Sequence, residues 1–405
     1  MVDIESYMKA CFLCARKCGI NRMKRAGRCG ETYEVRAVRA ALHMWEEPCI
    51  SGRSGSGTVF FEGCSLGCVY CQNREISIGL PPHQWGQTVQ AQARRDVPER
   101  SEGLSPLSLS GVKGTGLSTH QRGQTVQARP RRGAPGRSEG LSPLSKSGID
   151  GEPLPALRHD DRTGLPDFHV TEERLARIAI GLEKSGANNI NFVTPTHFIP
   201  QIINTVGYAR ELGLSVPVVY NTSSVETPES IDLLDGTADV FLPDLKYMDA
   251  EAASRYSDMP DYFKVASAAI ERMVRISGGP CFKDTEEGQL MVRGTIVRHL
   301  VLPGRTEDSK RILKYLHEEY GSEIYISIMN QYTPMPGIGL RYPELNRRIT
   351  KREYEKVVDY ALSIGIEQAF IQEGKTAEES FIPAFDGEGI FAPPDAGGET
   401  YSKRN

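Results

Sequence analysis

The sequence predicts an α/β fold in which helices cover a parallel sheet, and three observations lead to this prediction. Short runs of apolar, β-branched residues recur along the chain, and stretches with a 3.6-residue period separate them. The runs are apolar throughout rather than alternating, which is typical of a parallel sheet with both faces covered. In a barrel or part-barrel of this kind, the chemistry lies on loops at the carboxyl ends of the strands.

Each element of this fold is expected from its own run of residues. The expected strands are residues 58–62, 189–194, 216–220, 239–242, 294–302, 324–329 and 368–371. The expected helices are residues 171–183, with Thr171 as N-cap, and 199–212, 227–234, 262–276, 308–320 and 351–364.

An internal repeat interrupts this pattern. Residues 79–111 and 116–148 align with 24 of 33 positions identical, and both copies are rich in Ser, Gly, Pro, Gln and Arg. Such copies have almost no apolar face to bury, so we expect residues 80–166 to be a disordered, low-complexity insertion. The remaining chain divides into a cysteine-rich segment (1–50), a core in two parts (51–79 and 167–375) and a tail (376–405).

The bulk composition excludes some classes of protein. The 405 residues carry a net charge of −4, which gives no global basic signal for nucleic acid. No apolar run is long enough to span a membrane, and the N-terminus lacks the pattern of a signal peptide. Nine cysteines without an export signal are expected to be metal ligands in a cytoplasmic, anaerobic setting rather than disulfides.

The most informative motif is a cysteine loop that directly follows the first expected strand. Cys64, Cys68 and Cys71 have the spacing Cys-x3-Cys-x2-Cys, with Tyr70 before the third thiol. Three thiolates can hold three irons of a four-iron four-sulfur (4Fe-4S) cluster, which leaves the fourth iron open to a small molecule. The alternatives are a structural zinc site or a set of half-disulfides.

A second set of thiols lies near the N-terminus. Cys11, Cys14, Cys18 and Cys29 suit a closed metal site of four sulfurs, and the spacing leaves zinc and a second iron–sulfur cluster both open. A closed site is expected to serve structure or electron relay. Cys49 is expected to be a buried thiol, and no function is assigned to Cys281.

Read from end to end, the chain resembles the homologues of pyruvate formate-lyase activating enzyme, of the uncharacterised iron–sulfur branch, within the radical S-adenosylmethionine (SAM) superfamily. The resemblance covers most of residues 10–78 and 167–375. The phrases that carry it include the cysteine loop itself, Glu46-Glu-Pro48, Cys71-Gln-Asn73, Asn189-Ile-Asn-Phe-Val-Thr-Pro-Thr-His197, Leu242-Pro-Asp-Leu-Lys-Tyr247 and Arg298-His-Leu-Val-Leu-Pro-Gly304. It implies a partial (β/α)6 barrel that binds a 4Fe-4S cluster and SAM.

The resemblance also implies roles for individual residues around SAM. Tyr70 would lie against the adenine, Lys246 would pair with the SAM carboxylate, and Asp244 would orient Lys246. Asn221 and Thr222 stand where activating enzymes carry Asp-Thr, and Arg298 rather than His299 would face SAM. The Gly-Gly-Glu phrase that binds the SAM amino group in many relatives is replaced by Val193-Thr-Pro-Thr-His197. We therefore expect Thr196, or else Thr194 or His197, to take over this contact.

The expected activity is that of a radical SAM oxidoreductase, in which a 5′-deoxyadenosyl radical abstracts hydrogen from a substrate. By analogy the substrate is the glycine of a glycyl radical enzyme, and the electron donor is reduced flavodoxin or ferredoxin. Modification of another protein, RNA or a small molecule is the second hypothesis. A non-enzymatic iron–sulfur electron-transfer protein is the third.

Overall fold

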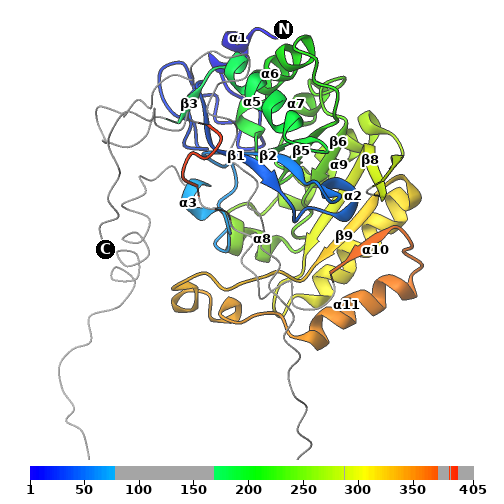
Figure 1. Ribbon diagram of the computed structural model, residues 1–405. Helices are drawn as coiled ribbons and strands as arrows, with labels where there is room; N and C mark the ends of the chain where they lie inside the picture. Colours follow the sequence, from blue (N-terminus) through cyan, green and yellow to red (C-terminus); the bar gives the residue numbers. More distant parts are fainter. Residues whose placement is uncertain (78–167, 287, 373–382, 384, 391–405) are drawn as a thin grey trace, which may run out of the picture.

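The structure is a computed structural model that describes residues 1–77, 168–286, 288–372, 383 and 385–390 (Figure 1). The expected disordered insertion and most of the expected tail lie outside these residues. The described helices are α1 (Ile4–Met8), α2 (Pro48–Ser51), α3 (Arg74–Ser77), α5 (Glu172–Lys184), α6 (Ile199–Glu211), α7 (Pro228–Asp232), α8 (Ala250–Ser257), α9 (Tyr262–Ser277), α10 (Thr306–Tyr320) and α11 (Lys351–Ser363). The described strands are β1 (Val35–His43), β2 (Ser56–Phe61), β3 (His169–Val170), β4 (Ile190–Val193), β5 (Val218–Thr222), β6 (Val240–Pro243), β7 (Cys281–Thr285), β8 (Gly288–Leu300), β9 (Tyr325–Met329) and β10 (Ala369–Ile371).

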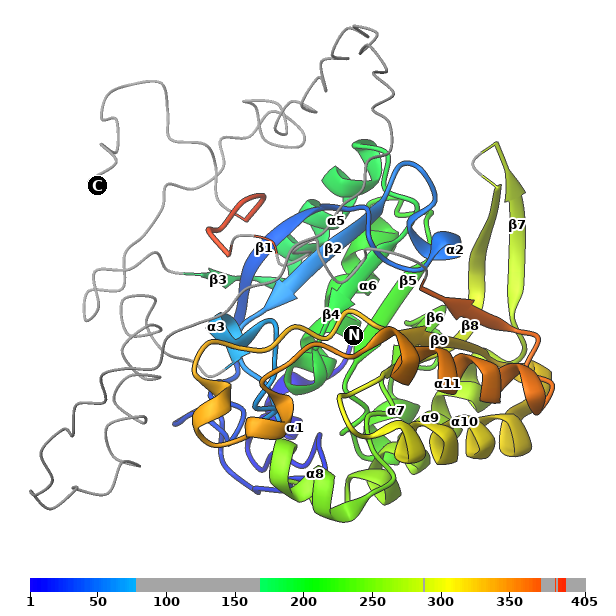
Figure 2. The ribbon, with the colours of Figure 1, turned by 90° about the horizontal axis from the view of Figure 1, so that it is seen from below.

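The strands form one sheet that is parallel through its centre. Its order is β10-β9-β8-β6-β5-β4-β2-β1-β3, and every neighbouring pair from β10 to β2 is parallel. The strands β1, β3 and β7 join in antiparallel fashion, and β7 pairs with the first half of β8 outside this path. The two ends of the path are not paired with each other among the described residues, so the sheet is an open part-barrel (Figure 2).

The connecting helices pack on one face of the sheet. Val59 and Phe61 of β2 contact the apolar sides of α5 and α6, while Val297 of β8 packs with α9 and α10. Successive residues of a strand point to opposite faces, so Phe60 and Arg298 point to the other side. This outer layer buries the largest apolar clusters of the described chain.

The inner face is filled by smaller elements instead of long helices. Cys49 and Ile50 of α2 pack against Val219, Val240 and Ile296, which closes one end of the part-barrel. The other end, at the carboxyl ends of the strands, is left to loops. Both faces of the parallel sheet are therefore covered, as the sequence predicts, but only the outer face is covered by the βα helices.

The expected strands and helices of the core are confirmed, mostly with small shifts at their ends, but β8 begins at Gly288, six residues before the expected start at residue 294. The first helix of the second core part begins after Thr171, whose side chain accepts from the Arg174 amide as an N-cap. Seven of the described helices and strands were not expected from the sequence: the short elements α1, α2, α3 and β3, and the longer elements β1, β7 and α8. In addition, residues 385–390 pack against β1, where the Ala40 amide donates to the Glu388 carbonyl at 2.8 Å, so part of the expected tail belongs to the core. Among the described residues, none of the helices combines the length and apolar character of a membrane span.

Candidate functional site

A cavity of about 250 Å³ opens at the carboxyl ends of the parallel strands. Its walls combine the cysteine loop with residues that end β4, β5, β6, β8 and β9. The polar lining residues are His43, Glu46, Gln72, Asn73, Thr194, Asn221, Ser223, Asp244, Lys246, Arg298 and Gln331, and the apolar ones include Phe60, Leu66, Tyr70, Leu300 and Met329. This is the place in a part-barrel where chemistry is expected.

All three thiols of the cysteine loop line this cavity. Cys64, Cys68 and Cys71 are free and half-buried, and the amide of Leu66 donates to Cys64 Sγ at 3.4 Å. Burial raises the pKa of the Cys68 thiol to about 11, and burial also raises the pKa of Cys64 and Cys71. The free thiols are therefore protonated at neutral pH, and a metal would have to displace these protons.

A chain of hydroxyl groups ends on one of these sulfurs. The Ser257 hydroxyl donates to Cys68 Sγ at 3.0 Å, Tyr247 lies 2.9 Å from the Ser257 hydroxyl, and Tyr70 is hydrogen-bonded to Tyr247. A thiolate has no proton to donate. With Cys68 ionised, each hydroxyl must therefore donate toward the sulfur, in the order Tyr70, Tyr247, Ser257. Such an aligned chain strengthens its final hydrogen bond.

The described residues contain no group of three or more His, Cys, Asp or Glu side chains arranged around a single metal ion. The cavity thiols need no such arrangement, because each thiolate of an iron–sulfur cluster binds a different iron. A zinc ion at the N-terminal thiols would need it.

The N-terminal thiols still lie in one neighbourhood. Cys14 interacts electrostatically with Cys11, Cys18 and Cys29, and these charges add to burial in raising the pKa of Cys14 and Cys29. The Arg22 guanidinium is fully buried beside them, with Nη1 3.9 Å from Cys11 Sγ, and it donates to main-chain carbonyls, among them that of Glu31. A buried cation in this place favours thiolates, and therefore a bound metal, over neutral thiols.

Asp244 and Lys246 lie together on the cavity wall, just after β6. Lys246 Nζ donates to Asp244 Oδ2 at 2.5 Å. Burial alone would lower the pKa of Lys246, but the negative charges of Asp244 and of an ionised Cys68 raise it well above the usual value. Lys246 is therefore a permanent cation beside the cysteine loop, and Asp244 fixes its position.

Arg298 lines the cavity as expected, but two carboxylates hold its guanidinium. It pairs with Glu46, and its Nε donates to Glu47 Oε1 at 2.9 Å. Burial alone would lower the pKa of Arg298, but the two glutamates raise it. His299 points to the opposite face, where its ring nitrogens contact the Leu245 carbonyl and the Ser309 hydroxyl.

Two of the expected SAM contacts do not line the cavity. Thr196 and Thr222 donate instead to Oε1 of the fully buried Glu226, each at 2.5 Å, and the Tyr220 hydroxyl donates to the same oxygen at 2.9 Å. The alternation of β5 explains this for Thr222, because Asn221 takes the inward position between two outward residues. Thr196 begins the 3₁₀ turn Thr196–Phe198, and this turn directs its side chain to Glu226 instead of the cavity.

Of the alternatives to Thr196, the structure places Thr194 at the cavity. Its φ is +55°, a left-handed conformation that is costly for a β-branched residue. Strained residues of this kind concentrate at functional sites. His197, in contrast, is buried away from the cavity, and its Nε2 lies 2.7 Å from the Glu62 carbonyl oxygen.

His197 gives a testable pH dependence. Burial, with a smaller effect of Arg22, lowers its pKa from 6.5 to about 3. Below pH 6.5 the unfolded chain binds a proton that the folded chain rejects, so this residue destabilises the fold as the pH falls. We expect the free energy of unfolding of native protein to fall relative to that of His197→Gln by about 1.4 kcal/mol per pH unit below 6.5. Urea unfolding of both proteins at about pH 7 and about pH 5 measures this, and parallel changes would contradict it.

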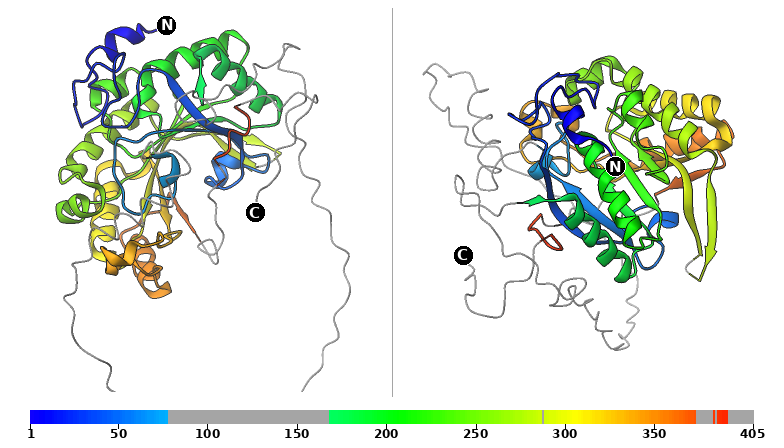
Figure 3. Two further views of the ribbon diagram at one scale, coloured as in Figure 1. Left: turned by 90° about the vertical axis from the view of Figure 1, so that its left-hand side faces the viewer. Right: turned by 90° about the horizontal axis from the view of Figure 1, so that it is seen from above.

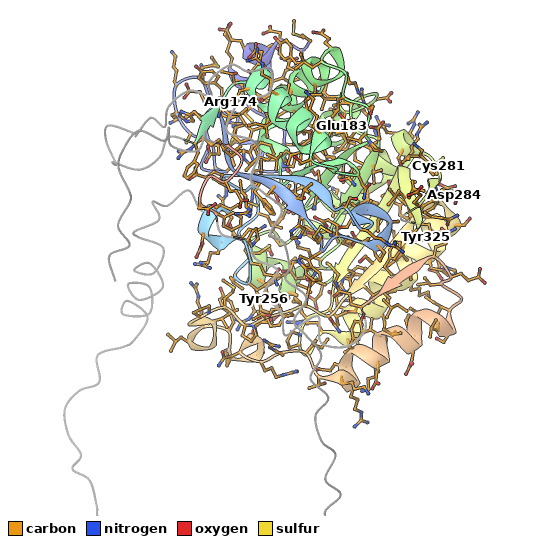
Figure 4. All side chains as sticks on the ribbon, in the orientation of Figure 1. Arg174, Glu183, Tyr256, Cys281, Asp284 and Tyr325 are labelled. Carbon is orange, nitrogen blue, oxygen red and sulfur yellow. The ribbon has the colours of Figure 1, made fainter. Side chains whose placement is uncertain are left out.

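Three further residues belong to the site although the sequence analysis did not predict them as site residues. Ser257 comes from α8, and Glu46 and Glu47 precede α2. The Asp249 N-cap of α8 could have revealed the helix, but not its contact with Cys68. Cys281 of β7 is exposed and is not among the residues that line the cavity. Figure 4 shows it apart from Tyr256 of α8.

Comparison with known proteins gives limited similarity. No family model matches the chain. An uncharacterised protein of Methanocaldococcus jannaschii is 24% identical over 360 residues, which cover 88% of this chain and 75% of the relative.

Two solved proteins show remote structural similarity. A domain of pyruvate-formate lyase-activating enzyme from Bacteroides vulgatus is 14% identical, with a TM-score of 0.31, and the match covers 44% of this chain and 91% of that domain. Streptococcus suis SuiB is 14% identical, with a TM-score of 0.35, and the match covers 51% of this chain and 44% of SuiB. SuiB bound to its precursor peptide SuiA gives the same TM-score at 13% identity, and that match covers 55% of this chain and 48% of SuiB. These likenesses do not decide the function, which has to be argued from the residues of the site.

Proposed function

We propose that the protein is a radical SAM enzyme. The observation that carries the proposal is that Cys64, Cys68 and Cys71 line one cavity together with Asn221, Asp244, Lys246 and Arg298. A simple electron carrier needs no cavity with fixed charges beside its cluster. The residues therefore support a cluster with an adjoining site for a charged small molecule, rather than electron transfer alone.

The donor set fits a 4Fe-4S cluster with one open iron. The cavity contributes three thiols, and no further cysteine is among its lining residues. Two of the sulfurs already receive hydrogen bonds, from Leu66 and Ser257, as cluster thiolates typically do. When bound and reduced, the cluster would supply the electron that cleaves SAM to methionine and a 5′-deoxyadenosyl radical.

The charges of the cavity wall complement SAM. Among the lining residues, the carboxylates of Glu46 and Asp244 balance the cations Lys246 and Arg298. Glu47 does not line the cavity, but it pairs with Arg298 and adds one negative charge beside the wall. SAM carries an ammonium, a carboxylate and a sulfonium group, and so has one positive charge in excess. The net charge around the wall therefore attracts SAM, and the individual charged side chains can each pair with one charged group of SAM.

We assign each polar wall residue a task from its position. Lys246, oriented by Asp244, would bind the SAM carboxylate as a fixed cation. Thr194 and Asn221, at the ends of neighbouring strands, would receive the SAM amino group, with Thr194 taking the part expected of Thr196. Tyr70 and Leu66 would cover the adenine, and Arg298 would hold Glu46 and Glu47 in place.

The substrate is the finer part of the proposal. The resemblance to activating enzymes favours the glycine of a glycyl radical enzyme, from which hydrogen would be abstracted. Modification of another protein, RNA or a small molecule is the second candidate. A glycyl radical signal in a mixture with a candidate partner, formed only with SAM present, would support the first.

The proposal predicts a second metal centre at the N-terminal cysteines. The described arrangement of these thiols favours an iron–sulfur cluster over zinc, which would need its ligands around one ion. Replacing Cys11, Cys14, Cys18 and Cys29 with Ser should remove one metal centre but leave the signal of the cavity cluster, because the two sets use separate ligands. Metal analysis and electron paramagnetic resonance (EPR) spectra of both proteins measure this. Unchanged metal content would contradict the second centre.

A further prediction concerns the hydroxyl of Ser257. Hydrogen bonds to cluster sulfurs stabilise the added electron and raise the reduction potential. We therefore expect Ser257→Ala to lower the potential of the cavity cluster, as measured in an EPR-monitored redox titration. Ser277→Ala removes another buried hydroxyl, bonded to Thr295, and should leave the potential unchanged. Equal potentials in native protein and Ser257→Ala would refute the role of this bond.

The binding of SAM tests the proposed function itself. Adding SAM to the reduced, cluster-loaded protein should change the EPR spectrum of the cluster, because SAM would bind beside it. In Lys246→Met, which retains the cysteines, a higher SAM concentration should be needed for the same change. A spectrum that does not respond to SAM would refute the proposal.

A further inference from the structure

The segment that carries the N-terminal cysteines has a charge unlike that of the chain as a whole. The 405 residues contain 52 acidic and 48 basic residues, yet residues 9–30 contain seven basic residues and no acidic one. We call residues 9–30 the basic cysteine segment. Its basic residues are Lys9, Arg16, Lys17, Arg22, Lys24, Arg25 and Arg28.

Most of this charge lies on the surface. Lys9, Lys17, Lys24, Arg25 and Arg28 are exposed, whereas Arg22 is buried. Lys9 pairs with Glu5 and Arg28 with Asp258, both outside the segment, so the charge excess rests on Lys17, Lys24 and Arg25. Figure 3 shows the dark-blue N-terminal segment at the edge of the molecule. A local excess of one charge raises the association rate of proteins of opposite charge.

The same surface presents an apolar anchor among the thiols. The Phe12 side chain is 54% exposed, and it stands between Cys11 and Cys14 in the chain. Aromatic residues and arginines are enriched at protein interfaces. Cys14 and Cys18 are themselves only half-buried, so the thiols lie close to this surface.

The inner side of the segment contacts the cysteine loop of the cavity directly. The Cys64 amide donates to the Cys29 carbonyl at 3.1 Å, and Arg16 Nε donates to the Ser65 carbonyl at 3.0 Å. Arg16 also donates through Nη2 to the carbonyl of Ser257, whose hydroxyl holds Cys68. The segment therefore reaches from the charged surface to two of the three cavity cysteines.

We propose that the basic cysteine segment is the docking surface through which an acidic one-electron carrier protein reduces the cavity cluster. The inference rests on the proposed function, and it adds the place and the charge of the electron donor. One electron leaves the carrier and one electron enters the cluster, and no atom is transferred. An iron–sulfur centre on the four N-terminal thiols would lie between the docked carrier and the cavity loop.

The test reverses three exposed charges of the segment in the full-length, cluster-loaded protein. The variant is Lys17→Asp with Lys24→Glu and Arg25→Glu, and Asp is chosen at position 17 because its φ is +43° and Asp tolerates this conformation. The matched control reverses three exposed lysines on α10 and α11: Lys314→Glu, Lys351→Glu and Lys356→Glu. Bleaching of the cluster absorbance is followed anaerobically by stopped flow, with reduced acidic ferredoxin or with photoreduced 5-deazariboflavin, a small uncharged reductant.

We expect the segment variant to be reduced by ferredoxin at least about tenfold more slowly than native protein at low salt. The difference should shrink at high salt because salt screens exposed charges. Reduction by deazariboflavin should be unchanged, and the control variant should behave as native protein with both reductants.

Two results would overturn the docking surface. Equal ferredoxin rates for native protein and the segment variant would show that the carrier docks elsewhere. Slower reduction with both reductants would show that the segment acts on the cluster itself rather than on the carrier. Native protein that assembles no cluster would refute the proposed function instead, so the two failures are distinguishable.

Discussion

Replacing Cys71 with Ala should abolish SAM cleavage and prevent stable assembly of the cavity cluster. The cavity offers three thiols, so this change leaves only Cys64 and Cys68 to hold the cluster. The same result is expected for Cys64→Ala and Cys68→Ala. Iron and acid-labile sulfide content after anaerobic reconstitution, together with the yield of 5′-deoxyadenosine, measures both effects.

Cys49 provides the matched control for these variants. Its thiol is also buried, but it packs against the inner apolar cluster and is not among the cavity-lining residues. Cys49→Ala should therefore keep the iron content and the cleavage of native protein. Turnover that persists in any of the three cavity variants would refute the assignment of the cluster ligands.

Replacing Arg298 with Met should strongly destabilise the fold. The side chains of Glu46 and Glu47 are only 7% and 5% exposed, and Arg298 is the cation paired with both. Removing one partner of a buried ion pair leaves an uncompensated charge, which costs about 3–5 kcal/mol. Urea unfolding at neutral pH measures the loss, and SAM binding should weaken because Glu46 lines the same cavity.

The stability of the Arg298→Met variant should also depend on pH in a way that reports the buried charge of Glu47. In the native protein Arg298 outweighs the effect of burial and lowers the pKa of Glu47. Without the arginine, burial should raise this pKa, so the variant should recover stability as the pH falls and Glu47 binds a proton. Arg347→Met removes a pair with Glu353 in which the arginine side chain is 44% exposed and the glutamate 18%, and it should cost about 1 kcal/mol. An Arg298→Met variant that loses no more than this control would contradict the account.

The sequence predicts the core of the fold because local patterns determine it. Apolar β-branched runs appear as the parallel strands, and the amphipathic periods appear as the long helices. The sequence misses β1 for a physical reason: its Val-Arg-Ala-Val-Arg-Ala-Ala-Leu-His segment is rich in good helix formers, and only pairing with β2 makes it extended.

Only those residues of the site that lie in short sequence motifs could be predicted from the sequence. The spacing of the cysteine loop places three thiols together, and the phrases after the strands bring Asn221, Asp244 and Lys246 to the same edge. The contacts of Arg298 with Glu46 and Glu47 join residues about 250 positions apart, and no local pattern encodes them. Whether Thr194 or Thr196 faces the cavity depends on the backbone conformation of a single turn, and the spacing of residues in the sequence does not determine that conformation.

The central claim is that Cys64, Cys68 and Cys71 hold a cluster that cleaves SAM. The most direct measurement is the amount of 5′-deoxyadenosine that the anaerobically reconstituted protein forms from SAM with dithionite, compared with Cys71→Ala. The account predicts product from the native protein and none from the variant. A native protein that carries a full cluster and yet forms no 5′-deoxyadenosine would contradict it.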